Sequence, residues 1–182
     1  KVLNNVSDVY KNNREKIIAQ ASQMQDIFLK INQRSAVLNQ PLLPFVDKII
    51  SYLDEEYGSF KGAPKFPQFY LFDAMFYFYL KTNDKKYFKP VETLLRNICS
   101  KGIYDQLIGG IARYTVDDKW IVPHFEKMLY DNIQFISLLS KFYQSTKSDY
   151  FKSKLKQTIK FINTEFVNNI GLYGSAYDAD SE

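Results

Sequence analysis

The sequence contains a single cysteine, a single histidine and a single tryptophan among its 182 residues. One cysteine, Cys99, excludes a disulfide framework within the chain. Because Cys99 lies at helical spacing in an apolar run with Leu94, Leu95 and Ile98, we expect it to be a core residue.

Clustered positive charge and long hydrophobic runs are also lacking. The net charge is +4, from 24 basic and 20 acidic residues. The lysines are scattered, whereas nucleic-acid-binding proteins gather their charge on one face. The longest apolar run, residues 69–80, is too short for a membrane span and contains Asp73. With no secretory signal at Lys1, the prediction is a cytoplasmic protein that binds neither nucleic acid nor membrane.

Aromatic residues, by contrast, are abundant. The chain has 15 Phe and 14 Tyr, and apolar residues make up 46% of it, which is enough for a sizeable core. Aromatic side chains fill wide helix interfaces and also line sugar-binding clefts. Composition does not separate these uses, of which core packing is the commoner.

Apolar residues recur every three or four positions along most of the chain, which predicts an all-α fold. The first helix should run over about residues 7–33. The second should hold Pro44 in its first turn and Gly58 as its C-terminal cap. The third should begin near Pro67. Apolar residues cover nearly its whole circumference, which predicts a buried helix.

Three further helices complete the pattern. The fourth should run from near Pro90 to Gly102. The fifth carries apolar residues at helical spacing, namely Phe125, Met128, Leu129, Phe135, Ile136 and Leu139. The sixth should extend from an N-cap at Ser148 to about Asn168.

The loops after the second, fourth and sixth predicted helices open with the same element, Gly-x-aromatic. It occurs at residues 58–60, 102–104 and 171–173. One such element per helical pair indicates stacked helical hairpins with the longer loops on one face. In the longest loop, residues 109–116 could pair with 119–122 around a turn at 117–118, which predicts a small β-hairpin.

Residues 113–132 hold the densest group of polar and aromatic side chains. His124 should lie at the start of the fifth helix, where it could transfer protons with Glu126 or Asp131 as its partner. The alternative is that His124 only caps the helix. Trp120 could stack on a sugar ring or anchor its loop onto the helices.

The chain closes with acidic residues at alternate positions, Asp178, Asp180 and Glu182. Their spacing is similar to that of a calcium loop, but the glycine and distal glutamate of an EF-hand are missing. We therefore expect no metal site. The carboxylates could instead hold sugar hydroxyls or take part in acid–base chemistry.

Four segments together resemble one family. They are GAPKFP at 62–67, GIYD at 102–105 leading into GGIARY at 109–114, WIVPHFEKMLYDN at 120–132, and AYDADSE at 176–182. They resemble the YyaL-like family, which includes the spermatogenesis-associated thioredoxin-domain proteins. The resemblance implies an (α/α)6 toroid similar to six-hairpin glycosidases and N-acylglucosamine 2-epimerase. Residues 1–182 would then be a single domain forming part of the toroid, without the family's thioredoxin-like domain and remaining hairpins.

The resemblance also implies a site at one mouth of the toroid. The expected catalytic residues are His124, Glu126, Asp178 and Asp180, and the expected substrate-binding residues are Arg113, Tyr114, Trp120, Asp131 and Lys65. No metal or other cofactor is implied. The sequence departs from the family pattern at Gln106, where a histidine is usual, and at Ile108 and Ile111.

Two functions follow from this pattern. The first is a carbohydrate-active domain that binds or converts a sugar at the loop face. The alternative is a non-catalytic helical scaffold for the thioredoxin-like domain and partner proteins, with the polar cluster used up in loop–loop hydrogen bonds. A partial toroid would also expose the apolar side of residues 70–78, which predicts self-association.

Overall fold

The computed structural model describes residues 2–32 and 42–180. Although the sequence predicts one domain over residues 1–182, the contacts divide the chain into two units, Lys1–Pro41 and Leu42–Glu182. Each unit is described by itself. Within the described residues, no helix is both long and apolar enough to cross a membrane.

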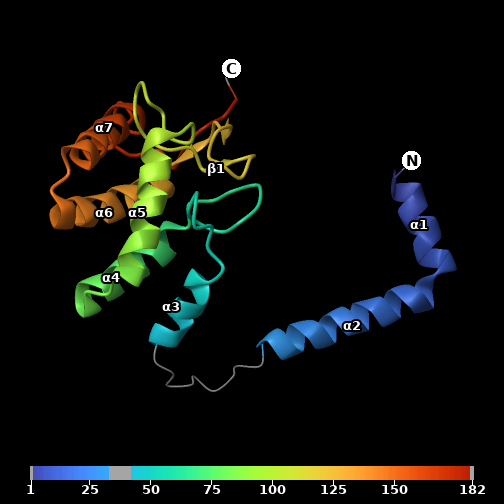
Figure 1. The fold of residues 1–182 in the computed structure, drawn as a ribbon. Helices are drawn as coiled ribbons and strands as arrows, with labels where there is room; N and C mark the ends of the chain where they lie inside the picture. The colour runs from blue at the N-terminus through green and yellow to red at the C-terminus, as the bar shows by residue number, and fades with distance from the viewer. Residues whose placement is uncertain (1, 33–41, 181–182) are drawn as a thin grey trace. The chain divides into compact units, whose positions relative to one another are not determined.

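The first unit contains two helices, α1 (Val2–Asn12) and α2 (Arg14–Asn32), shown in blue in Figure 1. The sequence predicts a single helix over residues 7–33. The structure corrects this prediction, because the helix is interrupted at Asn13. Backbone hydrogen bonds of 3.0 Å still link Asn13 to the turns before and after it. The predicted end at Gln33 lies outside the described residues.

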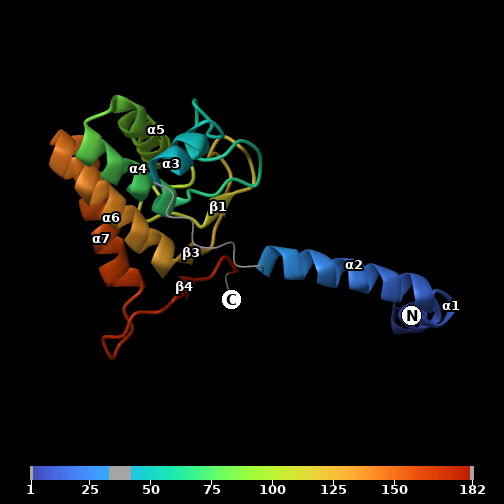
Figure 2. The same cartoon turned by 90° about the horizontal axis from the view of Figure 1, so that it is seen from below.

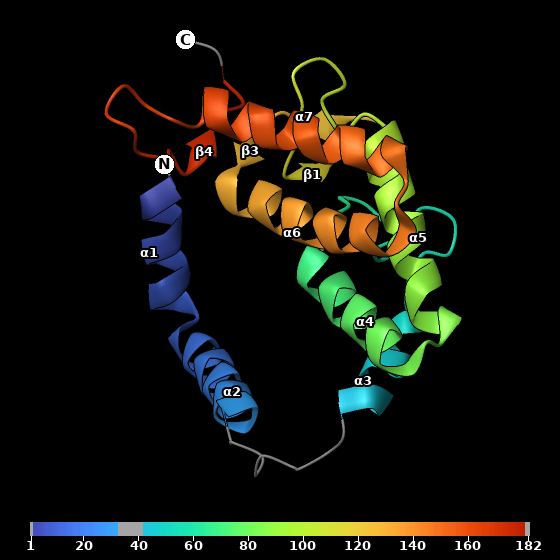
Figure 3. The ribbon, with the colours of Figure 1, turned by 90° about the vertical axis from the view of Figure 1, so that its left-hand side faces the viewer.

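The second unit is built from helices α3 (Leu42–Ile50), α4 (Phe69–Thr82), α5 (Lys85–Ser100), α6 (Leu129–Thr146) and α7 (Asp149–Glu165). α4 and α5 form one hairpin and α6 and α7 form the next. α4 also packs on α6, so that α6 lies between α4 and α7 (Figure 3). The predicted helical hairpins are therefore confirmed.

Short turns set the direction of the paired helices. After α4, Asn83 adopts the left-handed conformation (φ 57°), and the carboxylate of Asp84 accepts a hydrogen bond from Lys86 N, which begins α5. Pro90 therefore lies inside α5, and the predicted start there is wrong. Ser148 is the N-cap of α7 as predicted, although its side chain makes no capping hydrogen bond.

The core lies between α4, α5 and α6. It is rich in aromatic and aliphatic side chains that are fully buried, including Phe72, Phe76, Leu94, Ile98, Phe135 and Phe142. Cys99 is part of this core, as predicted. Burial raises the pKa of the Cys99 thiol to about 12, so the thiolate that reacts with oxidants or metals is not formed at neutral pH.

Only one side of α4 is buried, which corrects the prediction of a helix buried all round. Phe72 and Met75 face the core, whereas Tyr70, Tyr77 and Leu80 are more than half exposed. These exposed residues recur at intervals of seven and three, so they lie on one side of the helix. The partial toroid leaves this side of α4 uncovered.

The three Gly-x-aromatic elements have a common structural role. Their aromatic residues Phe60, Tyr104 and Tyr173 each form an isolated antiparallel bridge within their own loop. Gly102 is required by close approach, because a Cβ there would collide with the carbonyl oxygen of Ile121. Gly58, in contrast, follows the end of α3 by eight positions and does not cap it, which corrects that prediction.

The three longer loops meet on one face, as predicted. Lys65 and Thr115 exchange two backbone hydrogen bonds, which join the first loop to the second. The second and third loops are joined by β3 (Lys127–Met128), which pairs antiparallel with β4 (Ala176–Tyr177). Figure 2 shows β3 and β4 at the beginning of α6.

Candidate functional site

The predicted hairpin forms in the middle loop, with a shifted return strand. β1 (Tyr114–Thr115) pairs with β2 (Pro123–His124) rather than with 119–122. The intervening turn is held by the Asp117 carboxylate, which accepts hydrogen bonds from the backbone N–H groups of Lys119, Ile121 and Val122. Burial opposes ionisation of Asp117, but these donors outweigh it and lower its pKa. Asp117 is therefore a structural residue.

His124 lies in β2 and not at the start of a helix, which corrects its predicted position. Its ring stacks on Tyr114 with centroids 4.8 Å apart, and Tyr114 stacks on Phe66 at the same distance. His124 Nδ1 is buried without a hydrogen-bond partner in the described structure. The two rings separate His124 from the pocket described next.

A pocket of about 200 Å³ opens where α4 and α6 begin. α4 contributes Phe69 and Tyr70, and α6 contributes Tyr130, Asp131 and Gln134; Phe66, Pro67, Gln68 and Arg113 complete the lining. The pocket thus contains aromatic rings, two amides, one carboxylate and one guanidinium. A few polar groups converging on an apolar pocket are typical of a small-molecule site.

Asp131 is the most perturbed group of this pocket. Its Oδ2 atom is buried and has no hydrogen-bond partner in the described structure. Burial raises the pKa of Asp131 to about 6; the charge of Arg113 opposes this rise, and the charge of Glu126 adds to it. A carboxyl with this pKa exchanges protons near neutral pH, which is what a general acid or base requires.

We expect this shift to make the stability of the fold depend on pH. The folded-state pKa lies above the ordinary value of 3.8, so folded chains hold the proton more tightly, and stability falls as pH rises between about 4 and 6. Asp131→Asn removes the effect. We therefore compare the melting temperatures of Asp131→Asn and the wild type. The value for the variant minus that for the wild type should increase from pH 4 to pH 6 and stay constant above pH 6. A difference that does not change with pH would contradict the assignment.

Arg113 and Glu126 form an ion pair beside the pocket. Arg113 Nη1 lies 3.1 Å from Glu126 Oε2, and Arg113 N donates a hydrogen bond of 2.9 Å to Glu126 O. The Glu126 carboxylate raises the pKa of Arg113 further. Arg113 lines the pocket, whereas Glu126 does not.

The acidic C-terminal segment reaches the same region through the β3–β4 pair. Lys127 faces Tyr177 in the register, and the acidic residues begin directly after this pair. Asp178 and Asp180 are exposed and do not line the pocket. Among the described residues, no three His, Cys, Asp or Glu side chains are grouped closely enough to hold a metal ion.

Two of the predicted substrate-binding residues are structural. Trp120 is fully buried, and its Nε1 donates a hydrogen bond of 2.7 Å to Tyr57 O, so it anchors the loop and has no free face for a sugar. Lys65 is 1% exposed, and its Nζ lies 2.7 Å from Asp54 Oδ2. In this structure neither side chain can reach a ligand.

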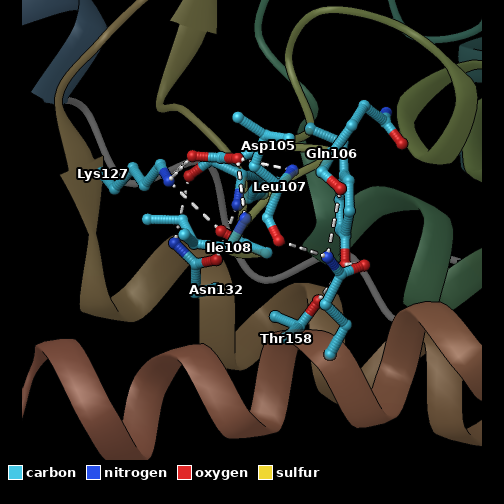
Figure 4. A network of polar contacts seen from close by, with 11 residues as sticks. Asp105, Gln106, Leu107, Ile108, Lys127, Asn132 and Thr158 are labelled. Atoms are coloured by element: carbon cyan, nitrogen blue, oxygen red, sulfur yellow. Dashed lines mark hydrogen bonds and ion pairs between the residues drawn. The ribbon is translucent and has the colours of Figure 1, made fainter.

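A second polar network connects the middle loop to α5, α6 and α7 (Figure 4). Lys127 Nζ pairs with Asp105 Oδ2 at 2.8 Å, and the Asn132 side chain bonds to both the N–H and the carbonyl oxygen of Ile111. Gln106, where the resemblance implies a histidine, donates to Cys99 O and accepts from Lys154 Nζ. Position 106 thus ties α5 to α7 and lies outside the pocket.

Comparison with curated proteins finds relatives that are much longer than this chain. Spermatogenesis-associated protein 20 of human is 34% identical over 132 residues and that of rat 33%; the match covers 70% of this chain. The chain is homologous to one segment of spermatogenesis-associated protein 20. That segment is 17% of the relatives' length. An uncharacterized protein of Caenorhabditis elegans is 33% identical over 137 residues, and no known family profile matches the chain.

Solved structures show the same fold. Cellobiose 2-epimerase from Spirochaeta thermophila matches 87% of this chain with a TM-score of 0.63 and 16% identity, covering 41% of the epimerase. A sugar epimerase from a ruminal bacterium matches 78% with a TM-score of 0.59 and 16% identity, covering 38%. These likenesses confirm the fold as part of an (α/α)6 toroid.

Sequence reasoning missed several residues of the pocket. Tyr70, Tyr130, Gln68 and Gln134 line it, and none of them is among the predicted site residues. The beginnings of the two helices that follow the first and second of the longer loops were an available signal. Which helix ends meet in space, however, depends on the packing of α4 on α6.

Proposed function

We propose that this chain is part of a carbohydrate-active domain, and that the pocket at the beginnings of α4 and α6 holds a sugar. The observation that carries the proposal is the Asp131 carboxyl, whose Oδ2 atom is buried without a hydrogen-bond partner, in a pocket lined by aromatic side chains. The fold shared with sugar epimerases supports it by analogy, since one fold hosts many functions.

Asp131 would act as the acid–base group in this proposal. With a pKa of about 6, both of its protonation states are present near neutral pH. Tyr70 and Tyr130 would pack on the apolar face of the sugar ring. Arg113 and Gln134 would hydrogen-bond to its hydroxyl groups.

The other predicted catalytic residues take supporting roles in the proposal. Glu126 would set the charge beside Asp131 through its pair with Arg113. Asp178 and Asp180 would contact the part of a ligand that extends beyond the pocket. His124 and Tyr114 would position Phe66 by stacking behind it.

A thermal-shift screen of the full-length protein against mono- and disaccharides and their amino-sugar derivatives tests the proposal. A sugar at 100 times its Kd should stabilise the wild type by about 2.7 kcal/mol. Asp131→Asn should lose most of this shift, whereas the matched control Asp149→Asn should keep it, because the Asp149 side chain on α7 is 94% exposed. If no sugar shifts the melting temperature of the wild type, the sugar site is refuted.

One set of observations favours the scaffold as a second candidate. Several polar side chains of the loop face are engaged within their own loop or with a helix, as the pairs Lys65–Asp54, Lys127–Asp105 and Gln106–Lys154 show. A scaffold would support partner proteins, including the thioredoxin-like domain that the resemblance implies. For both candidate functions we propose a cytoplasmic location.

Self-association is proposed from the uncovered side of α4. Tyr70, Tyr77 and Leu80 are 54–61% exposed there. For the 182-residue chain we expect light scattering to show dimers whose fraction rises with concentration, and Tyr77→Lys to shift the balance toward monomer. A monomer at high concentration would contradict this.

A further inference from the structure

The charges of the pocket do not balance. Arg113 is its only cationic lining residue among those described, and Arg113 is paired with Glu126. Asp131 is the only acidic lining residue described, and its Oδ2 lacks a hydrogen-bond partner. Above the pKa of Asp131, the three groups together carry one uncompensated negative charge.

Aromatic rings line the same pocket as this carboxylate. Tyr70 is 61% exposed, Tyr130 47% and Phe66 37%, and all three line the pocket. The faces of aromatic rings carry negative potential and attract cations, and aromatic side chains form the cages that recognise quaternary ammonium groups. The aromatic residues and the unpaired charge therefore favour the same kind of ligand.

We propose that the pocket selects a ligand that carries an ammonium group, which pairs with Asp131 and packs against Tyr70 and Tyr130. The sugar part of the inference rests on the function proposed above, and the ligand class is then an amino sugar with a free amine. Phosphorylated and carboxylated sugars would add a second negative charge beside Asp131 and are disfavoured.

The size of the pocket limits the ligand further. Its volume of about 200 Å³ is below the range of about 300–1,000 Å³ that drug-sized ligands occupy. A small ammonium compound or a single sugar ring is therefore the expected scale. Any larger ligand would extend out of the pocket.

Choline and its uncharged isostere 3,3-dimethyl-1-butanol test the charge preference alone, because they share one shape. Titration of the full-length protein, followed by NMR or calorimetry, should give about fivefold to tenfold tighter binding of choline. Asp131→Asn should reduce this ratio to about one, and Asp149→Asn should leave it unchanged. Tyr70→Leu, at an exposed position outside the core, should weaken choline binding independently of the carboxylate.

The pH dependence provides a second readout. Choline keeps its charge at every pH, so a change in its affinity reports the protein groups at the pocket: Asp131, with Arg113, Glu126, Tyr130 and Tyr70 around it. Choline should bind more tightly as the pH rises from 5 to 7, because Asp131 ionises over this range. Asp131→Asn should remove the change.

The outcomes separate this inference from the proposed function. Equal binding of choline and its isostere, together with binding of glucose, would overturn the ammonium preference and leave the sugar site standing. Binding of choline but of no sugar, glucosamine included, would support the ammonium site and refute the sugar site. If neither class binds, both proposals are refuted.

Discussion

Trp120→Ala is expected to lower the free energy of unfolding by about 3–5 kcal/mol, as large-to-small changes of buried aromatic residues do. Trp120 is fully buried in the core, and it is the largest buried side chain of the second unit. The change removes its packing and also leaves Tyr57 O without its hydrogen bond. Urea denaturation followed by circular dichroism measures the loss.

Trp120→Phe is the milder comparison, because it keeps one aromatic ring and removes the N–H donor together with part of the indole volume. Its loss should be smaller, about 1–3 kcal/mol. If Trp120 were instead a sugar-stacking residue, Trp120→Ala would leave stability nearly unchanged and abolish ligand binding. That result would contradict its burial.

Asn132→Leu is expected to cost about 2–4 kcal/mol, because each buried backbone group left without a partner costs about 1–3 kcal/mol. Asn132 is fully buried in α6, and its side chain accepts from Ile111 N at 2.8 Å and donates to Ile111 O at 3.1 Å. Leucine has a similar shape and offers neither bond. The loop that carries Arg113 would then lose its attachment to α6.

Ser137→Ala, on the exposed side of the same helix, is the control and should change stability by less than about 0.5 kcal/mol. Hydrogen exchange of the Ile111 amide gives a local readout. In Asn132→Leu this amide should exchange much faster than in the wild type. An unchanged rate would show that the side-chain bond does not hold the loop.

The helical hairpins could be predicted because their signal is local. Apolar residues at helical spacing, such as Phe135 and Leu139, are buried in the core as the pattern requires. Helix boundaries were less predictable. Proline suits the first turn of a helix, which predicts that the fourth helix begins near Pro90. The carboxylate of Asp84 instead caps α5 at an earlier position. Nothing in the apolar pattern ranks these two signals.

The candidate site could be predicted only in part. The segment around His124 and Asp131 was identified as the region of interest, yet the helical spacing of Phe125 and Met128 suggested that the helix begins early. Pairing with Tyr114 and with Ala176 instead holds this stretch extended, so the helix begins at Leu129. These partners are distant in sequence, and periodicity contains no information about them.

The burial of individual polar side chains was the least predictable property. Lys65 and Trp120 have the chemistry of ligand-binding residues, and nothing in the local sequence indicates that Asp54 and Tyr57 O occupy their polar atoms. The shifted pKa of Asp131 has the same origin, since it arises from the surroundings that the packed loops create. Such properties follow from tertiary contacts and not from residue type.

The pairing of β3 with β4 also bears on where the chain can be cut. A shorter version ending at Glu165 would keep all of the helices, but Leu129 N would lose its acceptor, Ser175 O, at the first residue of α6. The beginning of that helix, two residues before Asp131, would be free to fray. Truncation after α7 would therefore give a protein of normal helical content whose pocket is loosened, so spectroscopy of helices alone would be a poor guide to a usable expression boundary.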